Sequence, residues 1–520
     1  MSEHRHLLKS ASTVSTITIL SRILGYIRDS RIAYLLGTGD LADAFMLAFR
    51  IPNLLRRLVG EGAVNAAVVP VFTGYLTEQR KEEAWQFINI LFTVATVVMT
   101  GVTIVGILLS PLIVRLYASG FTSTPGKAEI TTLLTRIMFP YIALVSVSAL
   151  SYGVLNSFRR FAAPAFAPVM LNLTIIAFSF LGGSVVANHA VALAVGVVVG
   201  GILQIAIQIR PLMRTGWRFR PAWDLAHPGL RQVGRMLVPV MFGVGILQIN
   251  VFVGIQFASK MAEGSVASLT LADRVMELVL GGYTLALSTA ILPLLARQAA
   301  LRRLDEMRTT LNLAMRMVLF ITIPATIGLV LLRYEIIEVL FQHGEFDARS
   351  TALTAYPLMF YALGLATISM VKIIVPAFYA LKDTRTPVQI GLVSMLLNLG
   401  LNYILIGPFH NGGPALATSL ATVFDSTCLM VIFYRRHGSM GMRDVARSLA
   451  KFLIAGGVMA VVTMGAMQMP GFYAGHLLQK VMALGVTILV AAGTYFGAAY
   501  LLRTRELSEV WKMYGQPAVD

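Results

Sequence analysis

The chain has 520 residues, of which 57% are apolar and only 13% are charged. A soluble domain has about 45–50% apolar and about 25% charged residues, so this composition, with a mean hydropathy of +0.74, excludes an ordinary soluble protein. The 42 Lys and Arg residues outnumber the 25 Asp and Glu residues, giving a net charge of +17, which we attribute to membrane topology rather than to nucleic-acid binding because the basic residues cluster in alternate connections.

Apolar segments long enough to cross a bilayer recur along the whole chain. A span needs about 20 residues, and unbroken runs such as 88–109 and 481–502 lack the alternating polarity of a membrane β-barrel. The polar residues 1–10 precede a run that we interpret as the first span and not as a signal peptide. We therefore predict an all-α polytopic membrane protein with about 14 transmembrane helices, at residues 11–37, 41–76, 85–117, 130–157, 164–187, 189–209, 234–260, 266–296, 309–333, 350–380, 386–406, 413–434, 448–469 and 478–502.

Basic residues alternate sharply between the connections that join these spans. The basic connections lie at the N-terminus, 80–81, 159–160, 210–235, 297–308, 382–385, 435–451 and the C-terminus. Cytoplasmic loops carry an excess of Lys and Arg. This pattern predicts that both termini are cytoplasmic, which requires an even number of spans.

The chain also carries an internal repeat. Three anchors recur at nearly one offset: Arg50 and Arg274 (274 − 50 = 224), Pro70 and Pro293 (293 − 70 = 223), and Pro164 and Pro387 (387 − 164 = 223). An even number of spans per repeat keeps both halves in the same orientation. We predict two pseudo-symmetric six-helix lobes plus two C-terminal helices, divided into an N-lobe (1–210), a cytoplasmic amphipathic linker (211–233), a C-lobe (234–437) and a C-terminal appendage (438–520).

The linker carries Trp217 and Trp223 among several arginines. Tryptophan favours the headgroup depth of a membrane, so one interpretation places this segment in the cytoplasmic interface. The alternative is a basic loop that only sets the topology.

Arginines inside the predicted spans are the most informative feature of the sequence. Arg22, Arg28 and Arg31 interrupt the first span, Arg50, Arg56 and Arg57 interrupt the second, and Arg274 lies in the corresponding span of the second half. A charge at the bilayer centre costs about 3 kcal/mol on the insertion scale. Such residues are tolerable when they face a wet cavity, and a cavity lined by arginine favours an anion.

The charges in the second span form one stripe. Asp43, Arg50 and Arg57 are spaced by seven residues, and Glu61 follows one helical turn later. Pro52 breaks the helix in the middle, and such breaks at membrane depth line cavities. The alternative is that some of these residues extend to the membrane surface or form structural ion pairs.

Three further groups of charges lie within predicted spans. Arg22 and Asp29 are seven residues apart and share a helix face. Asp273, Arg274 and Glu277 cluster in the second half, where a purely structural ion pair is the alternative. Lys372 is a lone cation in an apolar span.

No catalytic or nucleotide-binding signature stands out. The 8 histidines are scattered without a paired-ligand spacing, and there is no glycine-rich phosphate loop followed by Lys and Ser or Thr. We predict a protein that is not an enzyme, needs no metal or cofactor, and draws energy from an ion gradient or the membrane potential.

At these residues the sequence resembles the MurJ (MviN) lipid II flippases of the MOP exporter superfamily. The matching motifs run in family order over nearly the first 400 residues: Ser21-Arg22 with Gly25 and Arg28-Asp29, Asp43 with Phe45, Pro52-Asn53 with Arg56-Arg57, Glu61-Gly62-Ala63, Pro70, Asn156, Arg160-Phe161, Pro164 with Pro168, Leu171-Asn172, Ala272-Asp273-Arg274 with Glu277, Leu340 with Gln342, Gly344 and Phe346, Phe378-Tyr379 with Asp383, and Thr386-Pro387. The last two predicted spans match in placement only.

The resemblance implies a function and a set of site residues. Members of the family carry lipid II, an undecaprenyl-pyrophosphate-linked disaccharide-pentapeptide, from the cytoplasmic to the periplasmic leaflet of the bacterial inner membrane for peptidoglycan synthesis. The family's cavity arginines fall on Arg28, Arg56 and Arg274, and its two extra helices form a groove for the lipid tail. We add Arg22, Arg50 and Asp43 as candidate substrate-binding residues, and we assign gating or charge balance to Asp29, Glu61, Asp273, Glu277 and Lys372.

The implied partners are lipid II, the phospholipid bilayer and the cell-wall synthesis machinery, with no nucleic acid. Three alternatives stay open at this point. They are a related exporter of another lipid-linked oligosaccharide or of drugs, a membrane scaffold for cell-wall enzymes that transports nothing, and a membrane-embedded transferase. A cavity for cationic drugs calls for carboxylates in place of arginines.

Overall fold

The computed structural model describes residues 2–59, 63–78, 81–182, 186, 188–469, 473 and 475–509. Side chains are described for the same residues except 2–11, 55–59, 63–66, 239–247 and 249–251. Within these ranges all the named elements are helices, and the one extended pairing is an isolated bridge between Gly182 and Val186. The prediction of an all-α chain is confirmed.

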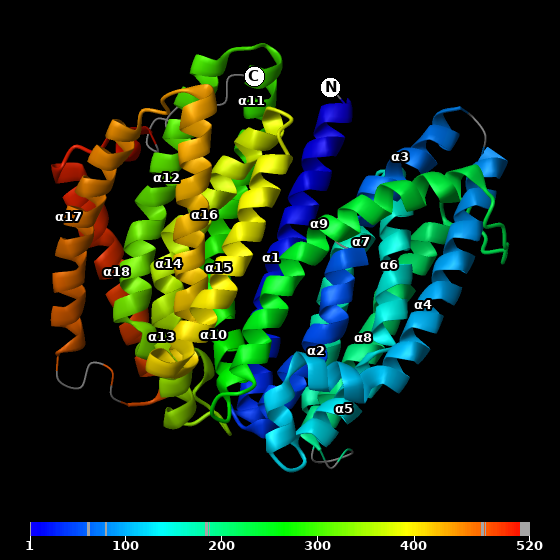
Figure 1. The fold of residues 1–520 in the computed structure, drawn as a ribbon, viewed down its shortest axis with the longest axis horizontal. Coiled ribbons are helices and arrows are strands. Elements are labelled where there is room, and N and C mark those ends of the chain that lie inside the picture. Colours follow the sequence, from blue (N-terminus) through cyan, green and yellow to red (C-terminus); the bar gives the residue numbers. More distant parts are fainter. Residues whose placement is uncertain are drawn as a thin grey trace. The chain divides into compact units, whose positions relative to one another are not determined.

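The helices follow one another with short connections (Figure 1). Those of the first half are α1 (Ser2–Leu36), α2 (Asp40–Val59), α3 (Ala63–Thr77), α4 (Lys81–Tyr117), η1 (Ser119–Ser123), α5 (Lys127–Met138), α6 (Tyr141–Ser157), α7 (Ala162–Ser179) and α8 (His189–Met213). Those of the remainder are α9 (Pro228–Ala258), α10 (Ser265–Val279), η2 (Leu280–Thr284), α11 (Leu285–Ala300), α12 (Leu304–Leu331), α13 (Arg333–Phe341), α14 (Ala348–Ala380), α15 (Arg385–Phe409), η3 (His410–Gly412), α16 (Gly413–His437), α17 (Met442–Met467) and α18 (Leu477–Leu501).

Ten helical segments within the described ranges are long and apolar enough to cross a membrane. One of these segments, Arg385–His437, contains both α15 and α16. Helices α1 and α2 are not among the ten, and both carry the arginines that dilute their apolar content. The chain is therefore a multi-pass membrane protein, and the count of 14 stays a prediction.

The chain divides into two compact units, and the first contains residues 1–267 and 343–346. Within it α7 packs against α1 and α8, α2 packs against α5, and α3 packs against α9 and α6. An apolar core joins α3, α4 and α6 through buried side chains such as Phe72, Phe87 and Leu155. Helix α9 belongs to this unit, whereas the predicted C-lobe begins with it; the lobe boundaries stay a prediction.

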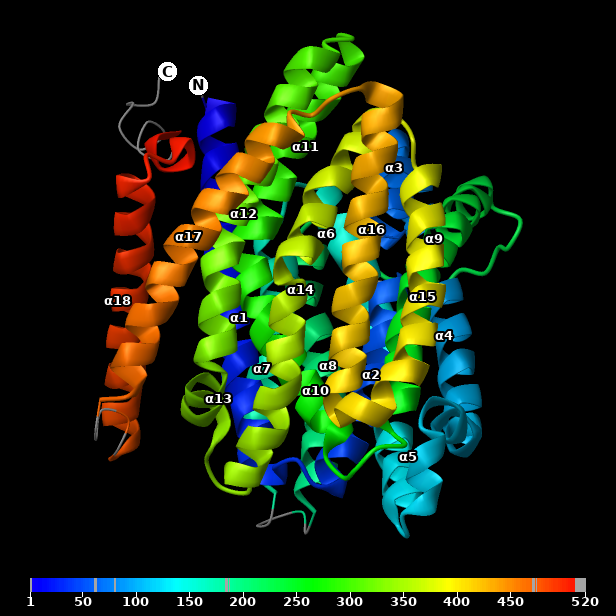
Figure 2. The ribbon, with the colours of Figure 1, turned by 60° about the vertical axis from the view of Figure 1, so that its left-hand side comes forward.

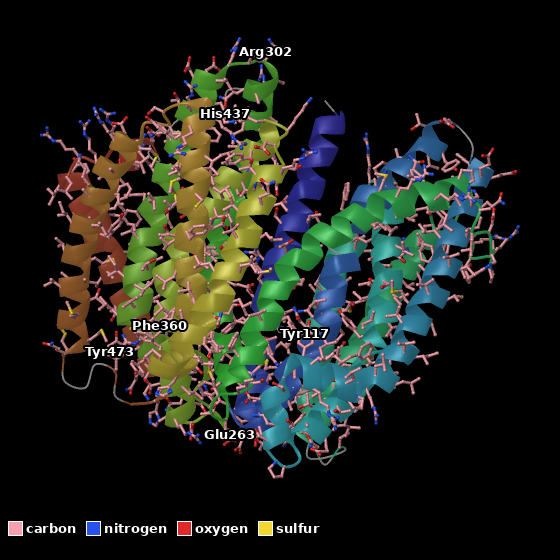
Figure 3. All side chains as sticks on the ribbon, in the orientation of Figure 1. Tyr117, Glu263, Arg302, Phe360, His437 and Tyr473 are labelled. Carbon is pink, nitrogen blue, oxygen red and sulfur yellow. The ribbon has the colours of Figure 1, made fainter. Side chains whose placement is uncertain are left out.

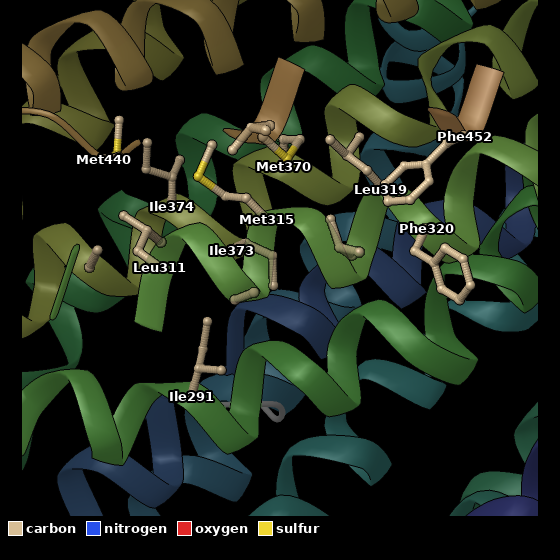
Figure 4. Packing of buried hydrophobic residues seen from close by; sticks show 14 of the residues in the cluster. Ile291, Leu311, Met315, Leu319, Phe320, Met370, Ile373, Ile374, Met440 and Phe452 are labelled. Atoms are coloured by element: carbon tan, nitrogen blue, oxygen red, sulfur yellow. The ribbon is translucent and has the colours of Figure 1, made fainter. Parts of the chain in front are cut away.

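The second unit contains residues 268–342 and 347–520. Helix α14 packs against α12 and α16, and the two C-terminal helices α17 and α18 lie side by side next to α12 (Figures 1 and 2). They share the core of the unit, part of which Figure 4 shows. Phe452 of α17 and Tyr495 of α18 both contact Phe320 of α12, at ring-centroid distances of 5.3 and 5.5 Å. The appendage is therefore built into this unit by its apolar side chains.

The internal repeat reappears in the helix boundaries. Helix α4 begins at Lys81 and α12 at Leu304 (304 − 81 = 223), and α7 begins at Ala162 and α15 at Arg385 (385 − 162 = 223). The same offset relates helix ends, since 223 residues separate Arg159 from Lys382. The sequence repeat thus corresponds to a repeat of local structure.

Four helices end with a basic residue in the left-handed conformation. Arg159, Arg302, Lys382 and Arg503 have φ of 56°, 56°, 62° and 47°, and after each the next backbone N–H donates to a carbonyl five residues earlier, as in Arg303 N to Gln298 O at 2.9 Å. Glycine usually takes this position. A cation there complements the helix C-terminus, and all four lie in connections predicted to be cytoplasmic.

In the second unit, Arg302 and His437 lie at one end while Phe360 and Tyr473 lie towards the other (Figure 3).

Candidate functional site

Arg28 is the most buried of the described arginines of α1. Its side chain lies between α1 and α7, with the residue only 9% exposed. Nε and Nη2 donate to Oδ1 of Asp29 at 2.9 and 2.6 Å, and Nη1 donates to Oδ1 of Asn172 at 2.9 Å. The Asn172 amide is itself oriented by donating to the Ser21 carbonyl at 3.0 Å. A complete guanidinium fork is therefore held in place inside the first unit.

The other arginines of α1 differ in surroundings. Arg31 stacks over the rings of Phe180 and Tyr34, at 4.4 and 4.7 Å from their centroids, and its Nε donates to Ser179 Oγ at 3.4 Å. These contacts tie it to the end of α7. Arg22 is exposed on α1.

Asp43, expected to bind substrate, is 1% exposed and has protein partners on three sides. Oδ2 accepts from Lys127 Nζ at 2.7 Å and from Gly264 N at 2.9 Å, and Oδ1 accepts from Ala267 N at 2.8 Å. Lys127 also pairs with Asp40 at 2.7 Å. Asp43 thus caps the first turn of α10 and neutralises a buried lysine, a combination that hydropathy could not reveal because its partners are 84 and 221 residues away.

The rest of the predicted stripe on α2 is described only in part. Arg50 is half-buried and interacts electrostatically with Tyr117 of α4. The side chains of Arg56 and Arg57 lie outside the described set, and Glu61 lies outside the described residues. The role of the stripe therefore stays a prediction.

Arg274 and its neighbours lie on α10 in the second unit. Arg274 Nη1 donates to Glu277 Oε2 at 2.8 Å, and both side chains are about one-third to two-fifths exposed (34% and 42%). Asp273 is half-buried beside them. Lys372 of α14 is half-buried, and its backbone carbonyl accepts from Ser288 Oγ of α11 at 2.7 Å.

An apolar cavity of about 570 Å³ lies in the second unit, and no residue pattern in the sequence predicts it. It follows directly on α10, because the helix continues through a π-helical turn, Leu280–Thr284, whose Tyr283 lines the cavity. π-helical turns occur frequently at functional sites. The remaining lining residues come from α11, α12 and the segment after α18: Ala286, Leu287, Ala290, Thr310, Leu313, Ala314, Met317 and Glu509. Its walls are suited to a hydrocarbon chain.

Among the residues that the structure describes, no group of three or more His, Cys, Asp or Glu side chains is arranged to hold a metal ion.

Known proteins match this chain in sequence. A family model described as lipid II flippase MurJ matches residues 32–482. A probable lipid II flippase MurJ from Vibrio cholerae is 33% identical, with 96% of this chain and 97% of the relative aligned, and one from Rhizobium tropici is 35% identical over 95% and 94%.

Solved structures agree in fold. A lipid II flippase MurJ in an inward closed conformation matches with a TM-score of 0.79 at 25% identity, over 94% of this chain and 99% of that one. An inward-facing multidrug resistance transporter of the MATE family matches with a TM-score of 0.65 over 84% and 98%; at 12% identity this likeness concerns the fold alone.

The helical bundle, its repeat and the arginine buried in it define a transporter fold of the MOP superfamily. This class agrees with the prediction of a membrane transport protein and not an enzyme. Within it, the chain belongs to the MurJ lipid II flippase family.

Proposed function

We propose that this protein is a flippase that moves lipid II from the cytoplasmic to the periplasmic leaflet. Family membership over nearly the whole chain supports the substrate, since the relatives bear the name of lipid II flippases. The observation that carries the proposal is the buried Arg28 fork in a helix of a multi-pass membrane protein. A buried guanidinium in such a helix can serve as a binding group when the transported molecule carries a phosphate.

The headgroup is recognised through its pyrophosphate. Guanidinium groups bind phosphate oxygens bidentately, and Arg28 already directs two of its donors, Nε and Nη2, to one carboxylate oxygen of Asp29. Arg56 and Arg274 join Arg28 in this role, with Arg22 and Arg50 as further contacts. When the pyrophosphate binds, it replaces the Asp29 carboxylate as the partner of Arg28. When the site is empty, Asp29 balances the positive charge of Arg28.

The polyprenyl tail occupies the apolar cavity of the second unit. Its walls are formed by Tyr283 of the π-helical turn and by apolar side chains of α11 and α12, and the polar groups Thr310 and Glu509 also line it. A tail in this cavity stays in a hydrocarbon environment while the headgroup crosses. In this arrangement the arginines bind the charged headgroup, and the cavity of the second unit binds the apolar tail.

Transport proceeds by alternating access between two lobes, with both termini in the cytoplasm of a bacterial cell. Energy comes from an ion gradient or the membrane potential, and a unit charge crossing 100 mV gains about 2.3 kcal/mol. Contacts made in one state alone act as gates. Asp29, Glu61, Asp273 and Glu277 are the acids assigned to gating or charge balance, together with Lys372.

The test is transport of fluorescent lipid II by the purified protein in liposomes, with an imposed membrane potential. Arg28→Ala, Arg56→Ala and Arg274→Ala should each lower the rate at least about tenfold, the loss expected for one charge-assisted contact of about 1.5–3 kcal/mol. Arg297→Ala, an exposed arginine of α11, is the matched control and should transport normally. Wild-type rates for all three cavity variants would contradict the proposal.

A further inference from the structure

The segment between α8 and α9 is fixed in place by side chains of α4. Asn89 Oδ1 accepts from Trp217 Nε1 at 3.1 Å and from Arg220 N at 3.2 Å, and Asn89 Nδ2 donates to Arg218 O at 3.3 Å. One turn later, Thr93 Oγ1 accepts from Ala222 N at 3.2 Å. Figures 1 and 2 show this green segment beside α4. Its non-helical backbone is therefore held by specific bonds.

The two tryptophans of this segment have opposite surroundings. Trp217 is 8% exposed and packs on Phe92 at a ring-centroid distance of 5.1 Å, so its indole lies inside the protein. Trp223 is 57% exposed, and Phe219 and Leu225 are exposed by 50% and 56%. The buried Trp217 anchors the segment and leaves three large apolar side chains directed outward.

The same surface is strongly basic. Arg214, Arg218 and Arg220 are exposed. The acid of the segment, Asp224, accepts from Ala226 N at 2.8 Å. Further exposed arginines flank these three: Arg159, Arg160, Arg210, Arg231 and Arg235.

The position of the segment selects its partner. Helix α8 is a candidate membrane span that ends at Met213, one residue before Arg214. Side chains immediately beyond a span lie at headgroup depth, where tryptophan is favoured and each basic residue increases the affinity for an anionic surface about fivefold. Exposed apolar groups beside arginines match a bilayer with phosphate outside and acyl chain beneath.

We propose that residues 214–225 form a binding surface for anionic phospholipids of the cytoplasmic leaflet. The exposed Arg214, Arg218 and Arg220 bind lipid phosphates, while Phe219, Trp223 and Leu225 insert between the acyl chains. Asn89 presents this surface by holding its backbone on α4. The inference is independent of which lipid the protein transports.

The test uses tryptophan fluorescence of the full chain in nanodiscs. Phosphatidylcholine discs contain either brominated phosphatidylglycerol or brominated phosphatidylcholine at equal mole fraction, because bromine quenches nearby indoles. The anionic bromolipid should quench more strongly at low salt. This excess quenching by brominated phosphatidylglycerol over brominated phosphatidylcholine should be lost in Trp223→Phe. It should also be lost at high salt, where exposed charges are screened.

A charge-matched pair of variants identifies the arginines. Replacing Arg218 and Arg220 with glutamine should reduce the excess at least about tenfold, whereas the same change at Arg435 and Arg443, exposed in the second unit, should leave it intact. Unchanged thermal unfolding of each variant shows that it is folded. Equal quenching by both bromolipids, or an excess that survives the Arg218 and Arg220 changes, would overturn the proposal and favour a soluble acidic partner for this surface.

Discussion

One carboxylate oxygen in the second unit accepts hydrogen bonds from side chains of two different helices. Glu506, which follows α18, is 1% exposed, and its Oε1 accepts from Arg316 Nη1 of α12 and from Ser448 Oγ of α17, both at 2.7 Å. Arg316 is 8% exposed and also donates to Asn312 Oδ1 at 2.9 Å. Glu506→Gln keeps the shape of this side chain and removes its charge.

The expected cost is large because the partner, Arg316, is only 8% exposed and its other carboxylate partner, Glu509, lies further away at 3.9 Å. Removing one member of a buried ion pair costs about 3–5 kcal/mol, whereas replacing both members with apolar groups is often neutral. Glu506→Gln should therefore lower the unfolding midpoint by roughly 6–20 °C, at about 2–4 °C per kcal/mol for a domain of 150–250 residues. Arg316→Met should behave alike, and Arg316→Met with Glu506→Leu should return towards the wild type.

The chain provides its own reporter for this measurement. Cys428 of α16 is its single cysteine, and it is partly buried. A thiol-reactive dye that fluoresces on coupling follows unfolding in detergent. Asp305→Asn, which breaks the solvent-exposed Arg308–Asp305 pair, is the control and should cost less than about 1 kcal/mol. A Glu506→Gln midpoint equal to that of the wild type, or a double variant as unstable as the two single changes added together, would refute the reasoning.

The same assay checks three further predictions. Asp43→Asn should destabilise by about 2 kcal/mol or more, since it weakens a helix cap and a buried pair, and Lys127→Met should partly restore the midpoint; a residue used for substrate alone would leave it unchanged. Burial raises the pKa of the Glu335 carboxyl, whose Oε2 finds no donor among the described residues. Because the folded state holds this proton more tightly, stability falls as pH rises through the raised pKa. Glu335→Gln should therefore raise the unfolding midpoint at pH 8 and not at pH 4, and an equal gain at both pH values would argue against this explanation. Arg302→Gly should stabilise the protein by about 1 kcal/mol, because glycine adopts the left-handed backbone without strain, whereas Arg302→Ala should not. Identical unfolding midpoints for these two variants would exclude backbone strain at this position.

The sequence by itself determined the properties that depend on local composition. Hydropathy and length established an all-α membrane protein, and the 223-residue offset anticipated the paired helix ends at Arg159 and Lys382. The burial cost of charge in a span singled out Arg28, which the structure buries. Composition and the cost of a buried charge could be predicted because neighbouring residues along one helix carry the signal, and the repeat could be predicted because the same anchors occur twice in the chain.

Tertiary structure alone decided which side chains meet. Nothing in the local pattern pairs Asp43 with Lys127, Arg28 with Asn172, or Arg316 with Glu506, since 84, 144 and 190 residues separate them. The two tryptophans of the linker look alike in sequence, yet Asn89 of α4 buries Trp217 and leaves Trp223 exposed. A polar or aromatic side chain acquires its role from the helix face packed against it, and that face is set by the packing of the whole unit.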